Sequence, residues 1–131
     1  MIALDTNVLV RFLVADDAAQ SRRARALIER GIAAGERFFV ADIVLCETVW
    51  VLDRAYGFSR AEIAGVLRAL VAARHVVMES AGRVRTALDN YTAKRGDFSD
   101  YLIAESAIAT GCERVATFDR ALHADRRFMK V

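Results

Sequence analysis

The sequence predicts an α/β fold in which a mostly parallel sheet has helices on both of its faces. Short apolar runs alternate along the chain with longer segments that have helical periodicity. Strands separated by helices cannot pair as hairpins, so they are expected to align in parallel. The chain has 131 residues, 55% of them hydrophobic, which suits one domain with a real core. We therefore expect residues 1–131 to form a single α/β domain.

Five short runs are predicted to form the strands. They are apolar, and the second contains two Phe and one Val, residue types that favour strands. The runs are Ile2–Leu4, Arg37–Val40, His75–Met78, Arg114–Thr117 and, as an edge strand, Phe128–Val131.

Helices are predicted between these strands, and most of them end at a glycine. The clearest helix start is Ser59-Arg-Ala-Glu62, a capping box in which Ser accepts from the Glu amide and the Glu side chain reaches back. The expected helices cover residues 7–15, 16–34, 41–56, 59–74, 79–95, 99–110 and 119–124.

Composition excludes several classes of protein. With 19 basic and 17 acidic residues the net charge is only +2, too small to indicate nucleic-acid binding by bulk electrostatics. The longest stretch without a charged residue, Ser106–Cys112, is far shorter than the roughly 20 residues of a membrane span. Asp5 and Arg11 interrupt the region where a secretory signal would need its apolar core. We expect a soluble, cytoplasmic protein that does not associate with a membrane.

The two cysteines do not form a metal-binding pair. Cys46 and Cys112 lie far apart in the sequence, with no C-x-x-C spacing. In a cytosolic protein such cysteines are expected to be reduced and buried.

Acidic residues follow two of the predicted strands. Asp5 follows the first strand, and Asp119 follows the strand that ends at Thr117. In parallel α/β sheets, functional sites gather at the carboxyl ends of the strands. Aspartate also caps helices routinely, so a capping role alone stays an alternative for each residue.

Glu47 lies in an apolar helical segment. Within residues 43–52, Glu47 and Thr48 are the only polar side chains, and the neighbours three and four positions from Glu47 are all apolar. A charged, unpaired carboxylate on such a face costs several kcal/mol. Glu47 therefore needs a cation, a hydrogen-bonding partner or a proton, and an arginine partner stays an alternative.

Asp100 and Asp97 lie at the start of a predicted helix. If the helix begins near Ser99, Asp100 lies in line with the apolar stripe formed by residues 103, 104, 107 and 108. The amino end of a helix also favours an anion. Asp97 lies three residues earlier, where a capping or loop role is at least as good an interpretation. Asp100 is the stronger candidate.

The acidic residues at positions 5, 47, 100 and 119 could meet at one rim of the sheet. Carboxylates that lie close together raise one another's pKa, so such a cluster is unfavourable unless it binds a cation. The donors are oxygen atoms only, which favours Mg²⁺ or Mn²⁺ over Zn²⁺. A metal held by carboxylates suits the activation of water for hydrolysis of a phosphodiester.

These motifs resemble those of PIN-domain ribonucleases, especially the VapC-type toxins of type II toxin–antitoxin systems. The likeness spans the chain, in the order and over the length that are usual for the family. The four matching segments are Leu4–Arg11, Glu47–Leu52, Asp97–Ala104 and Thr117–Asp119.

The resemblance implies a three-layer α/β/α sandwich with a central, mostly parallel sheet. It also implies an endoribonuclease that uses Mg²⁺ or Mn²⁺ to activate the water attacking an RNA phosphodiester. Asp5 and Asp100 would be the most direct metal ligands. Glu47 would ligate the metal or orient the attacking water, and Asp119 would complete the cluster or a second metal site. Asp97 is a possible substitute for, or support to, Asp100.

Further roles follow from the same resemblance. Thr6, Asn7 and Thr117 would provide hydrogen bonds around the metal ligands. The partners implied are RNA, a VapB-type antitoxin and a second copy of the chain in a homodimer. The apolar helix with Trp50 is compatible with such contacts, although an apolar stripe is more often core.

Arginines outside these motifs are not included in the site. They could contact RNA phosphates, but a solvated charged face is the default interpretation. These residues are Arg22, Arg23, Arg25 and Arg30 on one helix, and Arg126 and Arg127 near the end of the chain.

Two other functions remain as alternatives. The first is a catalytically inactive PIN-fold interaction domain. The second is a phosphoaspartyl-type phosphatase or a receiver-like domain. The phosphatase would require a second Asp at the position of Asn7. The receiver would require a Lys at the position of Thr117.

Overall fold

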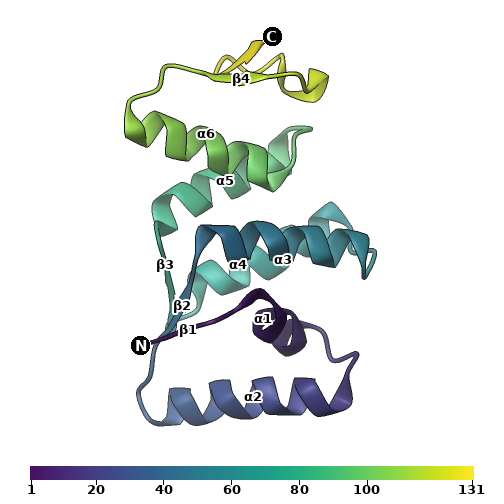
Figure 1. Ribbon diagram of the computed structural model, residues 1–131, viewed down its shortest axis with the longest axis vertical. Coiled ribbons are helices and arrows are strands. Elements are labelled where there is room, and N and C mark those ends of the chain that lie inside the picture. Colours follow the sequence, from purple (N-terminus) through teal and green to yellow (C-terminus); the bar gives the residue numbers. More distant parts are fainter. The chain divides into compact units, whose positions relative to one another are not determined.

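The computed structural model describes residues 1–131. They form two compact units, Met1–Glu79 and Ser80–Val131. Strands and helices alternate along the chain (Figure 1), and every strand pair is parallel. The predicted fold class, α/β with parallel strands, is confirmed. That all 131 residues behave as one domain stays a prediction.

The first unit is a three-stranded parallel sheet whose crossovers each contain two helices. The strands lie side by side in the order β1-β2-β3 (Figure 1), with Ile2 opposite Phe38 and Phe38 opposite Val76. The strands are β1 (Ile2–Ala3), β2 (Phe38–Val40) and β3 (Val76–Met78). The crossover helices are α1 (Thr6–Leu13), α2 (Ala18–Ala33), α3 (Asp42–Arg54) and α4 (Arg60–Ala72).

The core of the first unit is built by the buried faces of these helices and by β2. The α1 helix packs against both α2 and α3, and α3 packs against α4. A mostly apolar cavity of about 320 Å³ remains between α1, α2, α4 and the sheet. The fully buried side chains include those of Leu9, Phe38, Val40, Leu45, Leu52, Ile63 and Leu67.

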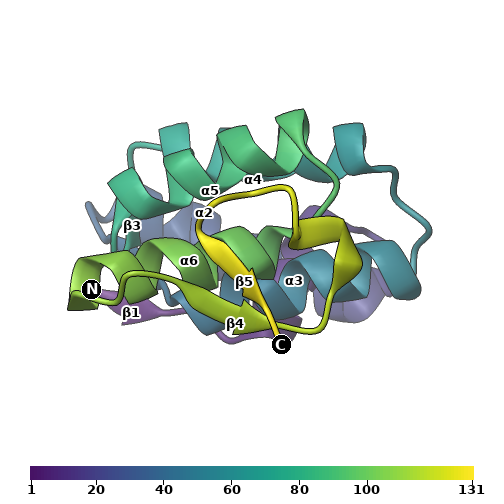
Figure 2. The ribbon, with the colours of Figure 1, turned by 90° about the horizontal axis from the view of Figure 1, so that it is seen from above.

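The second unit consists of two packed helices followed by a two-stranded parallel sheet. Figure 2 shows α5 beside α6 and β4 beside β5, and the rings of Tyr91 and Phe98 meet edge to face at 6.3 Å. The elements are α5 (Ala81–Ala93), α6 (Phe98–Thr110), β4 (Val115–Thr117), the 3₁₀ turn η1 (Arg120–Leu122) and β5 (Phe128–Lys130).

Every predicted strand and helix is present, with ends that differ from the prediction by a few residues. The capping box is confirmed: the Glu62 amide donates to Ser59 Oγ at 3.1 Å, and the Ser59 amide donates to Glu62 Oε1 at 3.0 Å. The short helix predicted after Asp119 is a single 3₁₀ turn. No helix has the length and apolar content that a membrane span requires.

The expected burial of the two cysteines and of one apolar face of α6 is wrong. Cys112 is exposed, and Cys46 is only half-buried, although both are free as predicted. Burial, together with the nearby Asp42 and Glu47 carboxylates, raises the pKa of the Cys46 thiol to about 11. On α6, Ile103 and Ile108 are exposed. The buried residues of this helix are instead Phe98, Tyr101, Leu102 and Ala104.

Within the second unit, an ion-pair network connects the loop before β5 to α6 and to the end of α5. Asp125 accepts from Arg127 Nη2 at 2.6 Å and from Lys94 Nζ at 2.8 Å. Arg127 Nη1 also donates to Glu105 at 3.0 Å, and its guanidinium lies over the Tyr101 ring. The Arg127 hydrogen bonds, and after them the bond from Lys94, hold the pKa of Asp125 far below its usual range.

This depressed pKa predicts that stability depends on pH. A carboxylate with a lowered folded-state pKa stabilises the fold above the unfolded value, near pH 4, and the contribution fades as pH falls further. We expect Asp125→Asn to lower the free energy of unfolding at pH 6 by about 1–2 kcal/mol. The difference between variant and wild type should shrink towards pH 3. Urea denaturation at both pH values measures it, and a difference that stays constant would contradict the expectation.

Candidate acidic site

Asp5 lies where the chain passes from β1 into α1. It occupies the position before the first helical residue, yet its side chain makes no capping hydrogen bond. The residue is exposed, and its carboxylate takes part in no ion pair. The capping interpretation of its side chain is therefore wrong, and both carboxylate oxygens remain available to a ligand.

Thr6 and Glu47 are joined by a hydrogen bond between α1 and α3. Thr6 is 6% exposed, and its hydroxyl donates to Glu47 Oε2 at 3.0 Å. The partner that Glu47 was expected to need is thus a threonine hydroxyl rather than an arginine. This contact fixes one oxygen of Glu47 and leaves the other available.

The expected burial of Glu47 is wrong. It lies on an exposed face of α3 together with Ile43 and Trp50, which are 66% and 62% exposed. The opposite face, with Leu45, Thr48 and Leu52, does the packing. Because α3 is apolar on both faces, its sequence did not indicate which one turns inward.

In the second unit, Asp97 and Asp100 share the amino end of α6. The helix begins at Phe98, so Asp97 is its cap residue, and the Asp97 amide donates to Asp100 Oδ2 at 2.9 Å. Asp97 is exposed, whereas Asp100 is half-buried. Burial, and then the neighbouring carboxylates of Asp97 and Asp119, raise the pKa of Asp100.

Asp119 caps the 3₁₀ turn that follows β4. Its Oδ1 accepts from the Ala121 amide at 2.9 Å, and its own amide donates to Thr117 Oγ1 at 3.0 Å. The capping interpretation is therefore correct for this residue, but the second carboxylate oxygen makes no such bond. Thr117 supports the Asp119 backbone, not its carboxylate.

The structure places the predicted residues in two groups, one in each unit. Asp5, Thr6 and Glu47 belong to the first, while Asp97, Asp100, Thr117 and Asp119 belong to the second. In neither unit do three or more His, Cys, Asp or Glu side chains form a ready metal site. Asn7 is exposed and borders a hollow between α1 and α2.

Sequence reasoning missed an acidic residue at the end of the third strand. Glu79 follows β3, and its Oε1 accepts from the Asp42 amide at 2.9 Å, at the amino end of α3. An anion is favourable there because of the helix dipole. The rule that selected Asp5 and Asp119, an acid within two residues of the end of a strand, would also have selected Glu79.

In each unit, taken by itself, the acidic side chains are of the chemical type that a hard divalent cation binds. The acidic groups at positions 5, 47, 97, 100 and 119 offer oxygen atoms only, and none forms an ion pair with arginine or lysine. Oxygen ligands are what Mg²⁺ and Mn²⁺ prefer. Burial is the main cause of the raised pKa of Asp100, and a nearby cation would offset the further rise caused by repulsion from Asp97 and Asp119.

Fold and site together define an α/β protein with acidic side chains at the carboxyl ends of parallel strands. The family model of the PIN domain matches residues 2–127, and the chain therefore belongs to the PIN domain family. The chain is also similar to a VapC ribonuclease of Aquifex aeolicus (strain VF5). The two are 28% identical over 120 residues, which cover 92% of this chain and 88% of the relative.

Proposed function

We propose that this protein is a metal-dependent endoribonuclease and the toxin component of a VapBC-type toxin–antitoxin pair. Membership of the PIN family and the similarity to a VapC ribonuclease support the proposal. The observation that carries it is the state of the acidic residues, none of which is neutralised by an arginine or lysine. Carboxylates kept free of cationic side chains are suited to binding a metal cation.

Four acidic residues would hold the metal in this proposal. Asp5 and Asp100 are its most direct ligands. Glu47 ligates the metal or orients the attacking water, and Asp119 completes the cluster or a second metal site. Asp97 supports Asp100 or takes its place.

When bound, Mg²⁺ or Mn²⁺ would lower the pKa of a water molecule and stabilise the charge on the phosphoryl oxygens. The chain itself orients the ligands. The Thr6 hydroxyl fixes Glu47, the Asp97 amide fixes Asp100, and the Thr117 hydroxyl holds the backbone at Asp119. Such outer hydrogen bonds keep ligand oxygens in place for a metal. Asn7 would add a further hydrogen bond.

The partners in this proposal are an RNA substrate, a VapB-type antitoxin and a second copy of the chain, and the protein acts in the cytoplasm. Ile43 and Trp50 offer an apolar surface on α3. Exposed aromatic and aliphatic side chains of this kind are common at protein interfaces. They support a role for α3 in contact with the antitoxin or in the homodimer.

Metal dependence is the first expected result. Incubated with total RNA, the protein should produce discrete cleavage products with Mg²⁺ or Mn²⁺ and none in excess chelator. Cleavage should return when the metal is added back. The cut ends are mapped by sequencing. Equal cleavage in chelator would contradict the metal role, and a lack of cleavage under every condition would favour the inactive interaction domain.

A further inference from the structure

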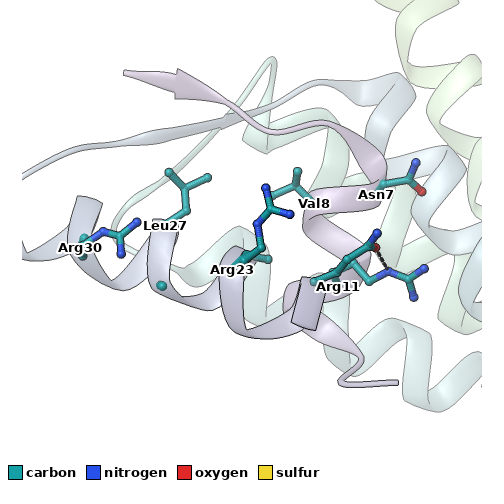
Figure 3. Close-up of a pocket in the computed structure, with 9 residues that line it drawn as sticks. Asn7, Val8, Arg11, Arg23, Leu27 and Arg30 are labelled. Atoms are coloured by element: carbon teal, nitrogen blue, oxygen red, sulfur yellow. Dashed lines mark hydrogen bonds between the residues drawn. The ribbon is translucent and has the colours of Figure 1, made fainter. Parts of the chain in front are cut away.

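An open hollow of about 540 Å³ lies between α1 and α2 in the first unit. Figure 3 shows Asn7, Val8 and Arg11 on α1 facing residues of α2 across it. The nine residues that line it are Asn7, Val8, Arg11, Gln20, Arg23, Ala24, Ala26, Leu27 and Arg30.

The hollow is strongly basic. Three of its lining residues are arginines, and none is acidic. Arg11 is already engaged: it donates to Asp16 at 2.6 Å, to Gln20 at 2.8 Å and to the Tyr56 hydroxyl. Arg11 is therefore held in place by the protein, which leaves Arg23 and Arg30 as the other two arginines of the hollow.

Arg23 and Arg30 are the two whose charge is available. Both are exposed, and neither makes a hydrogen bond or an ion pair through its side chain. With Leu27 between them they share one face of α2, because residues three and four apart are neighbours on a helix. Arg25, by contrast, lies over the Phe12 ring, and Arg22 is not part of the hollow.

We propose that this hollow binds the phosphodiester backbone of single-stranded RNA. The planar guanidinium fork matches the oxygens of a phosphate, and arginine commonly positions a nucleic acid through such contacts. Val8 on α1 and Leu27 on α2, both half-buried, offer apolar surface against which sugars or bases can lie. None of the lining residues is acidic, and the Asp16 carboxylate, 2.6 Å from Arg11, is paired with that arginine.

The spacing of the arginines indicates two separate contacts. Seven residues of α-helix separate Arg23 from Arg30, about 10 Å along the axis at 1.5 Å per residue. The two guanidinium groups would therefore hold different phosphates along a strand rather than a single one. Such a pair would align the strand along α2.

The position of the hollow favours RNA over an acidic protein segment. It begins at Asn7, two residues after Asp5, on the helix that also holds Thr6. Because Asp5 directly precedes α1, a strand with a phosphate near Asp5 would meet the hollow at the start of that helix. The inference rests on the proposed function in this respect, since it supplies the path of that substrate.

The test is the binding of a short fluorescein-labelled oligouridylate, measured by anisotropy in excess chelator across a range of KCl concentrations. We compare the wild type with R23Q/R30Q. The matched control is R22Q/R37Q, which removes the same charge from exposed positions outside the hollow. Glutamine keeps the helix propensity close to that of arginine, and circular dichroism checks the fold.

R23Q/R30Q is expected to weaken binding on the order of tenfold at low salt. The slope of log K against log salt should become shallower by about 1.4, which corresponds to two lost phosphate contacts at about 0.7 each. The control should change the slope by less than half as much. Equal effects of the two double variants, or no binding by the wild type, would overturn the proposal.

Two parallel assays separate the remaining explanations. Poly-glutamate is the probe for an acidic protein segment, and loss of its binding in R23Q/R30Q without loss of RNA binding would overturn the RNA proposal. Cleavage of total RNA is followed with the same proteins. If the wild type binds RNA through the hollow but cleaves nothing, the phosphate site stands and the nuclease proposal fails.

Discussion

Asp5→Asn and Asp100→Asn are each expected to lower the rate of RNA cleavage by at least about a thousandfold. Asparagine has nearly the same shape as aspartate, but its neutral carbonyl oxygen binds a divalent cation more weakly than a charged carboxylate does. Initial rates on an RNA containing one mapped cut site measure the effect. Full activity in either variant would show that the site lies elsewhere.

The structure provides controls for this result. Asp53→Asn removes a charge from an exposed aspartate of α3, 3.9 Å from Arg54, and should leave the rate unchanged. Asp97→Asn distinguishes the roles of the two acids at the start of α6. A loss as large as that in Asp100→Asn would make both acids ligands, whereas a loss of about 10–100-fold fits support of Asp100.

Melting temperatures test whether these losses come from unfolding. Asn at position 100 can still accept from the Asp97 amide, which donates to Asp100 at 2.9 Å. Removing its charge also removes repulsion from Asp97 and Asp119. In metal-free buffer the melting temperature should therefore stay the same or rise. A large fall would favour a structural role for the carboxylate instead.

The order and type of the elements could be predicted because local signals were strong. Ser59 and Glu62 indicated the start of a helix. Gly111 indicated the end of another, and it ends α6 in the left-handed conformation, with φ 98°. Strands with β-branched and aromatic residues were separated by helices, which left parallel pairing as the natural arrangement. These signals act over a few residues and do not depend on the rest of the fold.

Which face of a helix turns inward could not be predicted for α3 and α6. Both helices have apolar residues on every side, so periodicity did not separate the buried face from the exposed one. Ile103 was expected in the core and is 53% exposed, while Glu47 was expected to be buried and is exposed beside Trp50. Packing against neighbouring elements decides such cases.

The site residues were selected from motifs, but their hydrogen bonds depend on tertiary contacts. The bond from Thr6 to Glu47 joins positions 41 residues apart, which no local pattern indicates. The basic hollow also depends on tertiary contacts. The sequence showed arginines along one helix, but only the packing of α1 against α2 shows that Arg23 and Arg30 share a hollow while Arg25 covers Phe12.

Gly96→Ala is expected to destabilise the second unit strongly. The sequence marks Gly96 only as a helix stop, but a Cβ at this position would lie 2.4 Å from Leu122 Cδ2 and 2.7 Å from the Tyr101 hydroxyl. Tyr101 cannot yield easily, because it is 1% exposed and its ring contacts that of Phe128. Overpacking of this kind costs about 1–3 kcal/mol, measurable by urea denaturation.

Gly82→Ala is the matched control, because a Cβ there meets nothing within 4 Å and the residue lies inside α5. It should raise the free energy of unfolding by up to about 1 kcal/mol, since alanine restricts the unfolded chain and favours helix. Opposite signs for the two variants would show that close packing, rather than backbone freedom, requires glycine at position 96.

Because Gly96 directly precedes Asp97 and the start of α6, the same clash should also displace Asp100. Cleavage by Gly96→Ala should therefore fall even at temperatures where the variant remains folded, whereas Gly82→Ala should keep the wild-type rate.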